Sequence, residues 1–189
     1  SRDDILEALK TGEADFGLCS PPLIDDPSKG IRTEIVFCEQ SCVMLPPGHP
    51  MLGKKALRFD DMVGEALVTT SKESALRINL DHLMEKYDYH PQIVCESNDI
   101  NLIIRAVKSG LGFAILPRSI VFSNPSIIKY CVESSLPDTF GDIGLSYSTS
   151  EDDARDASQF ISFVKNFTEK YKEEYYSKNI WELHPDNEK

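Results

Sequence analysis

The sequence predicts an α/β fold built mainly from parallel sheets. Strand-sized apolar runs alternate along the chain with amphipathic helices that begin at Ser, Asp or Asn and end near glycine. This alternation is typical of βαβ units, in which a helix connects two parallel strands. The length of 189 residues allows one domain or two small lobes, and a chain of this size can bury a useful core.

The first predicted elements are a helix and a short buried strand. Apolar residues recur at helical spacing over residues 1–10, where Ser1 is a suitable N-cap and Gly12 follows the end. Ala14–Cys19 is predicted to be the strand, because the prolines that follow Ser20 stop it.

A long strand with a polar interruption is predicted over Glu34–Leu45. This stretch is rich in β-branched and aromatic residues, but Glu39, Gln40 and Ser41 break the apolar pattern. A break of this kind indicates a bulge or a bend within the strand.

The rest of the chain alternates between strands and helices, with one helical turn predicted at Phe59–Val63. Apolar runs bounded by turn residues predict the strands, and apolar stripes at helical spacing predict the helices. Residues 172–189 follow neither pattern. The predicted strands are Ala66–Thr70, Gln92–Glu96, Phe113–Leu116, Ile127–Val132 and Ile143–Tyr147, and the predicted helices are Ser71–Tyr87, Ile100–Ser109 and Asp153–Tyr171, with Phe160, Ile161, Val164 and Phe167 facing inward.

The chain is strongly acidic, with 20 Lys and Arg against 31 Asp and Glu and a formal net charge of −11. Such a charge repels nucleic-acid phosphates and anionic lipid surfaces, so we expect no DNA or membrane binding by these residues alone. No apolar run approaches the ~18–20 residues that cross a bilayer, and no apolar signal peptide opens the chain. We therefore expect a cytoplasmic protein, or one whose beginning has been removed.

The cysteines indicate reduced thiols and no metal centre. Their number is odd and their spacing forms no CxxC or Cys/His ligand pattern, so no metal or other cofactor is expected. Apolar neighbours suggest buried side chains in a reducing compartment. The five residues are Cys19, Cys38, Cys42, Cys95 and Cys131.

Polar side chains follow three predicted strands at the point where each strand ends. Ser20 follows the first strand, Thr69–Lys72 follow the strand that begins at Ala66, and Ser97–Asp99 follow Gln92–Glu96. Ligands of open α/β sheets bind at this edge, where helix N-termini favour anionic groups. Simple N-capping explains any one of these residues, and a cleft explains all three together. Lys72 adds a cation that is either a ligand contact or merely solvated.

Catalytic patterns are absent from the sequence. None of the four histidines has a Ser, Cys or carboxylate partner at a diagnostic spacing, and no HExxH, GxSxG or P-loop pattern occurs. The run Gly110-Leu111-Gly112 is too short for a dinucleotide motif, and we interpret it as a helix stop followed by a tight turn. We expect no enzyme activity.

Five segments resemble, in order, the effector-binding domain of LysR-type transcriptional regulators. They correspond to that family's "L..G..D..L" segment, its strand leading into a "GHPL" turn, its "S.LR..LD" helix, its "V..G.GIA.LP" segment and its last helix. In this sequence they are Ile5–Leu18, Cys42–Leu52, Ser74–Asp81, Val107–Pro117 and Ala157–Phe163.

The resemblance implies a fold like that of type 2 periplasmic binding proteins, with two α/β lobes joined by two crossing strands. Residues 1–39 and 140–189 would form lobe one, and residues 40–139 would form lobe two. The crossings would be Glu34–Leu45 and Ile127–Tyr147, with a hinge at Gln40 and Ser41. The first strand and helix of the family's lobe one, and its winged helix-turn-helix, have no counterpart in this sequence.

The resemblance also implies a function. A small, anionic metabolite would bind in the cleft, where the family's contacts fall on Ser20, Ser71, Lys72, Glu73, Ser97 and Asn98. Closure of the lobes would then reposition DNA-binding domains in a dimeric or tetrameric intact protein. DNA would be contacted only through a helix-turn-helix domain that is absent from this chain.

Two alternatives remain open on the same fold. An extracytoplasmic solute-binding protein would need a signal peptide and would tolerate five free thiols poorly. An enzyme acting on a small acid would need a carboxylate or base in the cleft, for which the sequence offers only Glu73 and Asp99.

Overall fold

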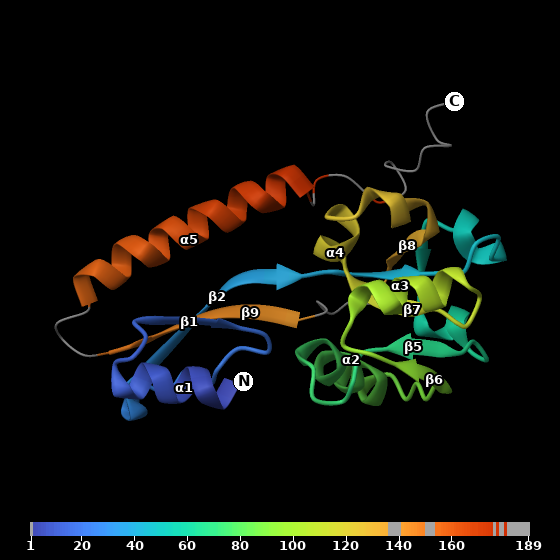
Figure 1. The fold of residues 1–189 in the computed structure, drawn as a ribbon. Helices are drawn as coiled ribbons and strands as arrows, with labels where there is room; N and C mark the ends of the chain where they lie inside the picture. The colour runs from blue at the N-terminus through green and yellow to red at the C-terminus, as the bar shows by residue number, and fades with distance from the viewer. Residues whose placement is uncertain (1, 136–140, 150–153, 176, 178–179, 181–189) are drawn as a thin grey trace. The chain divides into compact units, whose positions relative to one another are not determined.

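The computed structural model describes residues 2–135, 141–149, 154–175, 177 and 180. Figure 1 shows the fold. The predicted N-cap Ser1 and the predicted start of the last helix at Asp153 lie outside the described residues. The helices are α1 (Arg2–Thr11), α2 (Ala75–Lys86), α3 (Ile100–Lys108), α4 (Arg118–Phe122) and α5 (Ala154–Tyr175). The strands are β1 (Phe16–Cys19), β2 (Ile31–Glu39), β3 (Ser41–Met44), β4 (Ala56–Leu57), β5 (Leu67–Thr69), β6 (Ile93–Glu96), β7 (Ala114–Pro117), β8 (Cys131–Ser134) and β9 (Gly141–Ser148).

The chain divides into two compact units. Unit 1 comprises Ser1–Cys38 and Gly141–Tyr176, and unit 2 comprises Glu39–Phe140 and Ser177–Lys189. The sequence analysis assigned residues 140–189 to the first lobe, whereas Ile180 is completely buried in a core of unit 2. Its apolar side chain explains the difference, because it packs against α3 and the sheet of unit 2.

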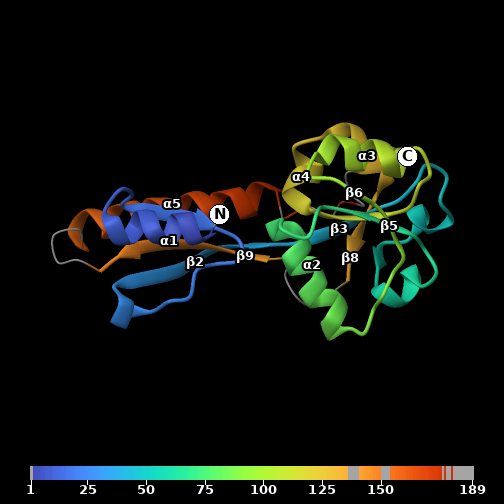
Figure 2. The ribbon, with the colours of Figure 1, turned by 60° about the horizontal axis from the view of Figure 1, so that its bottom comes forward.

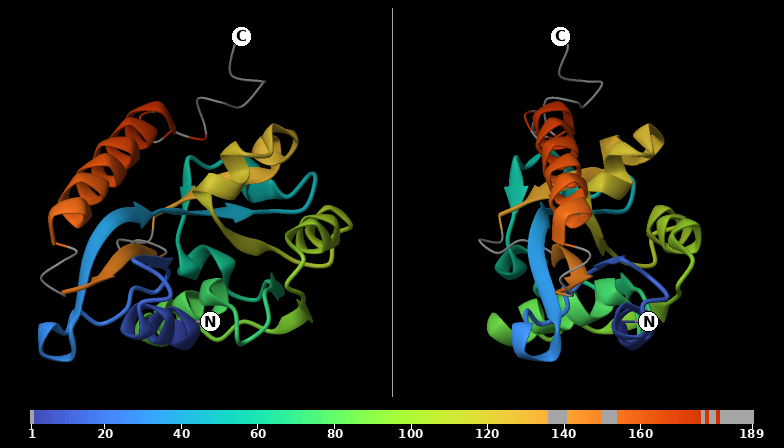
Figure 3. Two further views of the ribbon diagram at one scale, coloured as in Figure 1. Left: turned by 60° about the vertical axis from the view of Figure 1, so that its left-hand side comes forward. Right: turned by 90° about the vertical axis from the view of Figure 1, so that its left-hand side faces the viewer.

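Unit 1 is a three-stranded sheet in the order β1-β9-β2, covered by one helix on each face. Helix α5 packs Ile161 against Val36 and Leu145 on one face, and α1 packs Leu9 against the other (Figures 1 and 3). Gly17 is required in β1, because a Cβ atom there would lie 2.3 Å from the side chain of Ile5.

The predicted inward face of α5 is wrong at Phe167, which is 60% exposed. Ile161 is buried, and Phe160 is 38% exposed but packs its ring on Phe16 of β1, with the ring centroids 4.4 Å apart; Phe163 is 63% exposed. The three phenylalanines form an aromatic stripe, in which successive ring centroids lie 6.5 and 6.4 Å apart. The rings therefore contact one another along the helix surface.

Unit 2 has a four-stranded sheet in the order β4-β8-β3-β7 and a parallel pair, β5-β6. Strand β3 is buried on both faces: Val43 belongs to a core with α2, and Met44 belongs to a core with α3. Figure 2 shows α2, α3 and α4 around these strands. Gly112 allows β7 to approach β5, because a Cβ atom there would lie 2.2 Å from the carbonyl oxygen of Ala66.

Several predicted elements need correction. Strand β3 pairs with both β7 and β8 antiparallel, and β1 pairs with β9 antiparallel, so the expectation of mainly parallel sheets is wrong. The predicted strand Ile127–Val132 is a 3-10 helix over Pro125–Tyr130 followed by β8, since Pro125 starts a helical turn well. The predicted long strand Glu34–Leu45 is divided at Gln40 into β2 and β3. Other 3-10 turns lie at Pro27–Lys29, Pro50–Gly53 and Phe59–Met62.

Among the described residues, the cysteines are free thiols of two kinds. Cys42 and Cys131 are buried, whereas Cys19, Cys38 and Cys95 are only partly buried, which corrects the expectation for those three. Burial raises the pKa of the Cys42 thiol, and its hydrogen bond with Cys131 raises it further. Cys42 is therefore protonated and unreactive at neutral pH.

No helix in the described part of the chain combines the length and the hydropathy needed to cross a bilayer. Within the same residues, no group of three or more His, Cys, Asp and Glu side chains is arranged to hold a metal ion.

Candidate functional site

The candidate site in unit 2 lies where two neighbouring parallel strands end. Strands β5 and β6 pair so that Thr69 lies opposite Glu96, and the amide of Ser97 donates a hydrogen bond to the carbonyl oxygen of Thr69 (3.0 Å). The loops that follow the two strands therefore start side by side. One leads into α2 and the other into α3, so two helix N-termini begin near the same edge.

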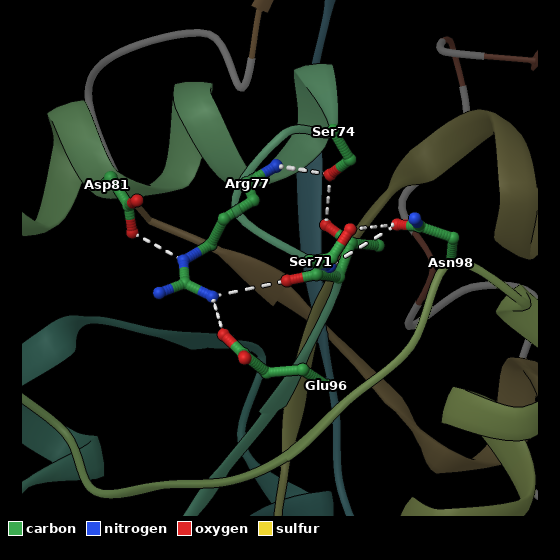
Figure 4. Close-up of polar contacts among 7 residues, drawn as sticks. Ser71, Ser74, Arg77, Asp81, Glu96 and Asn98 are labelled. Carbon is green, nitrogen blue, oxygen red and sulfur yellow. Dashed lines mark hydrogen bonds and ion pairs between the residues drawn. The ribbon is translucent and has the colours of Figure 1, made fainter.

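Ser71 and Asn98 join these two loops directly. The Ser71 hydroxyl donates to Asn98 Oδ1 at 2.7 Å, and the Ser71 amide donates to the same oxygen at 3.3 Å (Figure 4). Both bonds use the carbonyl oxygen of Asn98, so its NH₂ group points to the other side of the side chain as a donor. Residues 27 positions apart are thus brought together, as the strand-end argument predicts.

Helix α2 begins later than predicted, because Ser74 is its N-cap. The Ser74 hydroxyl accepts a hydrogen bond from the amide of Arg77 at 3.1 Å and donates one to the hydroxyl of Thr70. The amide of Ser74 also closes a turn onto the carbonyl oxygen of Ser71 (3.0 Å). Ser71 is therefore held in a tight turn before the helix rather than at its first position.

Lys72 and Glu73 are exposed in this turn. The structure therefore places them beside the cluster formed by Ser71 and Asn98, with their charges in solvent. At the other loop, the Ser97 hydroxyl accepts a hydrogen bond from the amide of Asp99 (3.1 Å). The N-cap of α3 is Asp99, whose carboxylate accepts from the amide of Asn101 (2.8 Å).

Arg77 forms hydrogen bonds next to the cluster of Ser71 and Asn98. Its side chain is buried; Nε donates to Asp81 (2.6 Å), and Nη1 donates to the carbonyl oxygen of Thr70 (3.2 Å) and to the carboxylate of Glu96 (Figure 4). One guanidinium thus joins the end of β5, the end of β6 and the first turns of α2. This spacing holds Ser71 and Asn98 within reach of each other.

These contacts stabilise the charged form of Arg77. Burial lowers the pKa of Arg77, but the hydrogen bonds to Glu96 and Asp81 outweigh burial and leave the pKa raised. Both carboxylates are half-exposed, with 41% and 44% of their side-chain surface accessible. The sequence analysis did not predict that Arg77 joins the two strand ends, although Arg77 is the arginine of the "S.LR" segment.

The cavities near the site are small or open. A cavity of about 10 Å³, which is room for about one water molecule, lies beneath Thr69 and Thr70. A wider, open groove of about 340 Å³ runs between α3 and α4 and begins beside the site at Ile100 and Asn101. Ser20, the remaining predicted contact, is half-buried at the end of β1 in unit 1.

Comparison with known proteins finds one family. The profile of the LysR substrate binding domain matches residues 1–168. An uncharacterized HTH-type transcriptional regulator, YybE of Bacillus subtilis, is 30% identical over 113 residues, which are 60% of this chain and 38% of that protein. The transcriptional activator LysR of Escherichia coli is 30% identical over 110 residues, 58% of this chain and 34% of that protein. The matched stretches span roughly a third of these two relatives.

Solved structures with the same fold include the effector binding domain of QuiR in complex with shikimate. Its TM-score is 0.67 at 18% identity, with 90% of this chain and 79% of that chain covered. A C206 mutant of OxyR from Corynebacterium glutamicum has a TM-score of 0.72 at 20% identity, with 93% of this chain and 54% of that chain covered. At these identities the likeness concerns the fold, which is the periplasmic-binding-protein-like fold expected from the sequence.

Proposed function

The chain belongs to the LysR substrate binding domain family, and we propose that it senses a small, anionic metabolite for a LysR-type transcriptional regulator. The observation that carries this proposal is the cluster of Ser71 and Asn98 at the carboxyl ends of two parallel strands. In support, two similar domains were solved with small molecules, QuiR with shikimate and CcmR with 2-PG.

The chemistry of the cluster favours an anionic group. The NH₂ group of Asn98 and the N-terminal ends of α2 and α3 supply hydrogen-bond donors and partial positive charge, and the Ser71 hydroxyl, whose proton is donated to Asn98 Oδ1, orients that NH₂ group. Lys72 supplies a full charge at the rim, and Ser97 completes the loop. We place Ser20 of unit 1 and Glu73 among the further contacts.

The proposed mechanism is a shift between conformations. The effector would favour one arrangement of unit 1 and unit 2, with bending where the chain passes between them near Gln40 and Ser41. In the intact protein, a dimer or tetramer in the cytoplasm, this change would reposition helix-turn-helix domains on DNA. The names of the relatives support this role, since they are transcriptional regulators and not enzymes.

A thermal-shift screen with small carboxylates, sugar acids and amino acids tests the proposal. At a ligand concentration of 100 times Kd, binding adds about 2.7 kcal/mol to stability, which raises the Tm of a domain of this size by about 5–10 °C. Ser71→Ala removes the hydroxyl that orients the Asn98 amide and should weaken binding about tenfold, the net contribution of one hydrogen bond.

Ser109→Ala is the matched control. Its hydroxyl bonds to the carbonyl oxygen of Ala106 at the opposite end of α3 (2.8 Å), so the affinity should remain that of the wild type. Equal affinities for the wild type and Ser71→Ala would place the effector elsewhere. Turnover of any bound acid by the isolated chain would instead support an enzyme.

A further inference from the structure

The first residue of α4, Arg118, is a buried cation of unit 2 that contacts the chain near the beginning of this unit. Its amide donates to the carbonyl oxygen of Gln40 at 2.8 Å, and its Nη1 donates to Gln40 Oε1 at 2.9 Å. Its Nη2 lies 3.4 Å from Glu133 Oε1, and its guanidinium carbon lies 5.1 Å from the ring centre of Phe122. Both charged side chains are nearly sealed from solvent, at 5% and 11% exposure.

This ion pair spans three strands of the sheet. Arg118 directly follows β7, where Pro117 pairs with Ser41, and Glu133 lies in β8 opposite Cys42. Strand β3 lies between β7 and β8, so the two side chains meet across its beginning. Next to them, the amide of Ser119 donates to the carboxylate of Glu39 (3.3 Å).

Glu133 also holds a segment from the far end of the chain. Its Oε1 accepts a hydrogen bond from the amide of Ile180 at 2.7 Å, and Ile180 is completely buried. The same carboxylate oxygen therefore serves Arg118 and Ile180 together.

These contacts all involve residues near the points where the chain passes between the two units. The chain passes between the two units at Cys38/Glu39, at Phe140/Gly141 and at Tyr176/Ser177. Gln40 follows the first passage, Glu133 precedes the second and Ile180 follows the third. A described residue of unit 2 near each passage thus contacts this ion pair or belongs to it.

We propose that Arg118 and Glu133 form a clasp that couples the unit 2 ends of all three connecting segments. Separation of this pair leaves a buried charge without its partner, so the contacts of the clasp are retained or lost together. Gln40 and Ser41, where the family resemblance implies a hinge, then move with unit 2, so the clasp shifts the bend from these residues to the neighbouring chain on the unit 1 side of Glu39. Arg118 is a positioning residue in this arrangement, and the clasp does not depend on the identity of any ligand.

Residue-resolved amide exchange by NMR on the full chain tests the coupling. In Glu133→Gln, the amide of Arg118, which bonds to Gln40 and not to Glu133, should exchange about tenfold faster. In Gln40→Ala, the amide of Ile180 should likewise exchange about tenfold faster, although the exposed Gln40 side chain bonds to Arg118 and the acceptor of that amide is Glu133. Purely local contacts would leave both of these amides unchanged.

The controls keep the test decisive. Glu96→Gln changes the other buried-arginine cluster and should leave the amides of Arg118 and Ile180 as in the wild type. If Glu133→Gln fails to fold, the exposed Gln40→Ala variant decides the question alone. Faster exchange of only the amide whose own acceptor was altered would overturn the clasp.

Discussion

Unit 2 contains two buried arginines that do different things. Arg77 and Arg118 each have 5% of their side-chain surface exposed, but Arg77 pairs with carboxylates that are 41% and 44% exposed, and Arg118 pairs with Glu133 at 11%. The first cluster thus has solvent-accessible carboxylates beside Ser71 and Asn98, where we propose that the ligand binds. The Arg118–Glu133 pair of the second is nearly sealed from solvent, and we propose that it couples chain segments. The exposure of the anion is therefore the physical difference between the two proposed roles.

The largest effect is expected for Arg118→Met. Removal of one partner of a buried pair leaves Glu133 charged and desolvated, which costs about 3–5 kcal/mol of unfolding free energy. Urea denaturation monitored by circular dichroism measures the loss. Arg105→Met on the exposed side of α3 is the control and should change the free energy by less than about 0.5 kcal/mol. A loss at Arg118 as small as the control's would remove the contrast with Arg77.

Arg77→Met should destabilise less, by about 1–3 kcal/mol. Glu96 and Asp81 regain water when the guanidinium is removed, so the penalty of a sealed charge does not arise. The same denaturation experiment gives the number. If Arg77→Met loses more unfolding free energy than Arg118→Met, solvent access to the carboxylates does not reduce the cost of removing the arginine. The predicted order of the two variants would then be wrong.

Ser74→Ala isolates the part of the Arg77 cluster that comes from helix capping. The loss of the side-chain acceptor for the Arg77 amide should cost about 1 kcal/mol. Ser74→Asp keeps an acceptor at the N-cap and should recover most of that free energy, as read from the urea midpoints of the three proteins. Equal midpoints for Ser74→Ala and the wild type would mean that the guanidinium alone holds the start of α2.

The smallest effect is a loss of unfolding free energy at alkaline pH, which comes from Tyr89 and from neither arginine. Burial raises the pKa of Tyr89 to about 12, and its hydroxyl donates to the carbonyl oxygen of Met62 (3.0 Å). Because the unfolded tyrosine ionises near pH 10, the unfolded state binds fewer protons between pH 10 and 12, so stability is complete below pH 10 and falls as the pH rises. At pH 10 the loss is about 0.4 kcal/mol.

Tyr89→Phe should remove this contribution, which is measured as the difference between the two proteins' unfolding free energies at pH 8 and pH 10. The same alkaline loss in both proteins would trace it to another group.

The sequence predicts the elements around the site well because their signals are local. The strands that became β5 and β6 and the helices that became α2 and α3 each show their own periodicity, and parallel strand ends bring Ser71 near Asn98. The roles of Arg77 and Arg118 were not predicted because their partners are distant in the sequence. Glu96 is 19 residues from Arg77, and Gln40 is 78 residues from Arg118. No local pattern marks such pairs.

Other differences have equally specific causes. Helix α4 was not predicted because it has only five residues and follows Pro117, which also ends β7. Antiparallel pairing of β3 with its neighbours depends on the path of the chain between the units, which the alternation of elements does not reveal. Phe167 follows the spacing of an inward face, yet Ile161 and Val164 pack into the core while Phe167 is exposed.

The aromatic stripe of Phe160, Phe163 and Phe167 determines how the isolated chain behaves in concentrated solution. Its attraction for other apolar surfaces acts only at contact, whereas the net charge of −11 repels other copies over a longer range. Salt shortens that range from about 10 Å at 0.1 M to about 3 Å at 1 M. The colloidal stability of the chain is therefore electrostatic in origin, and light scattering from its solutions should increase as salt is added.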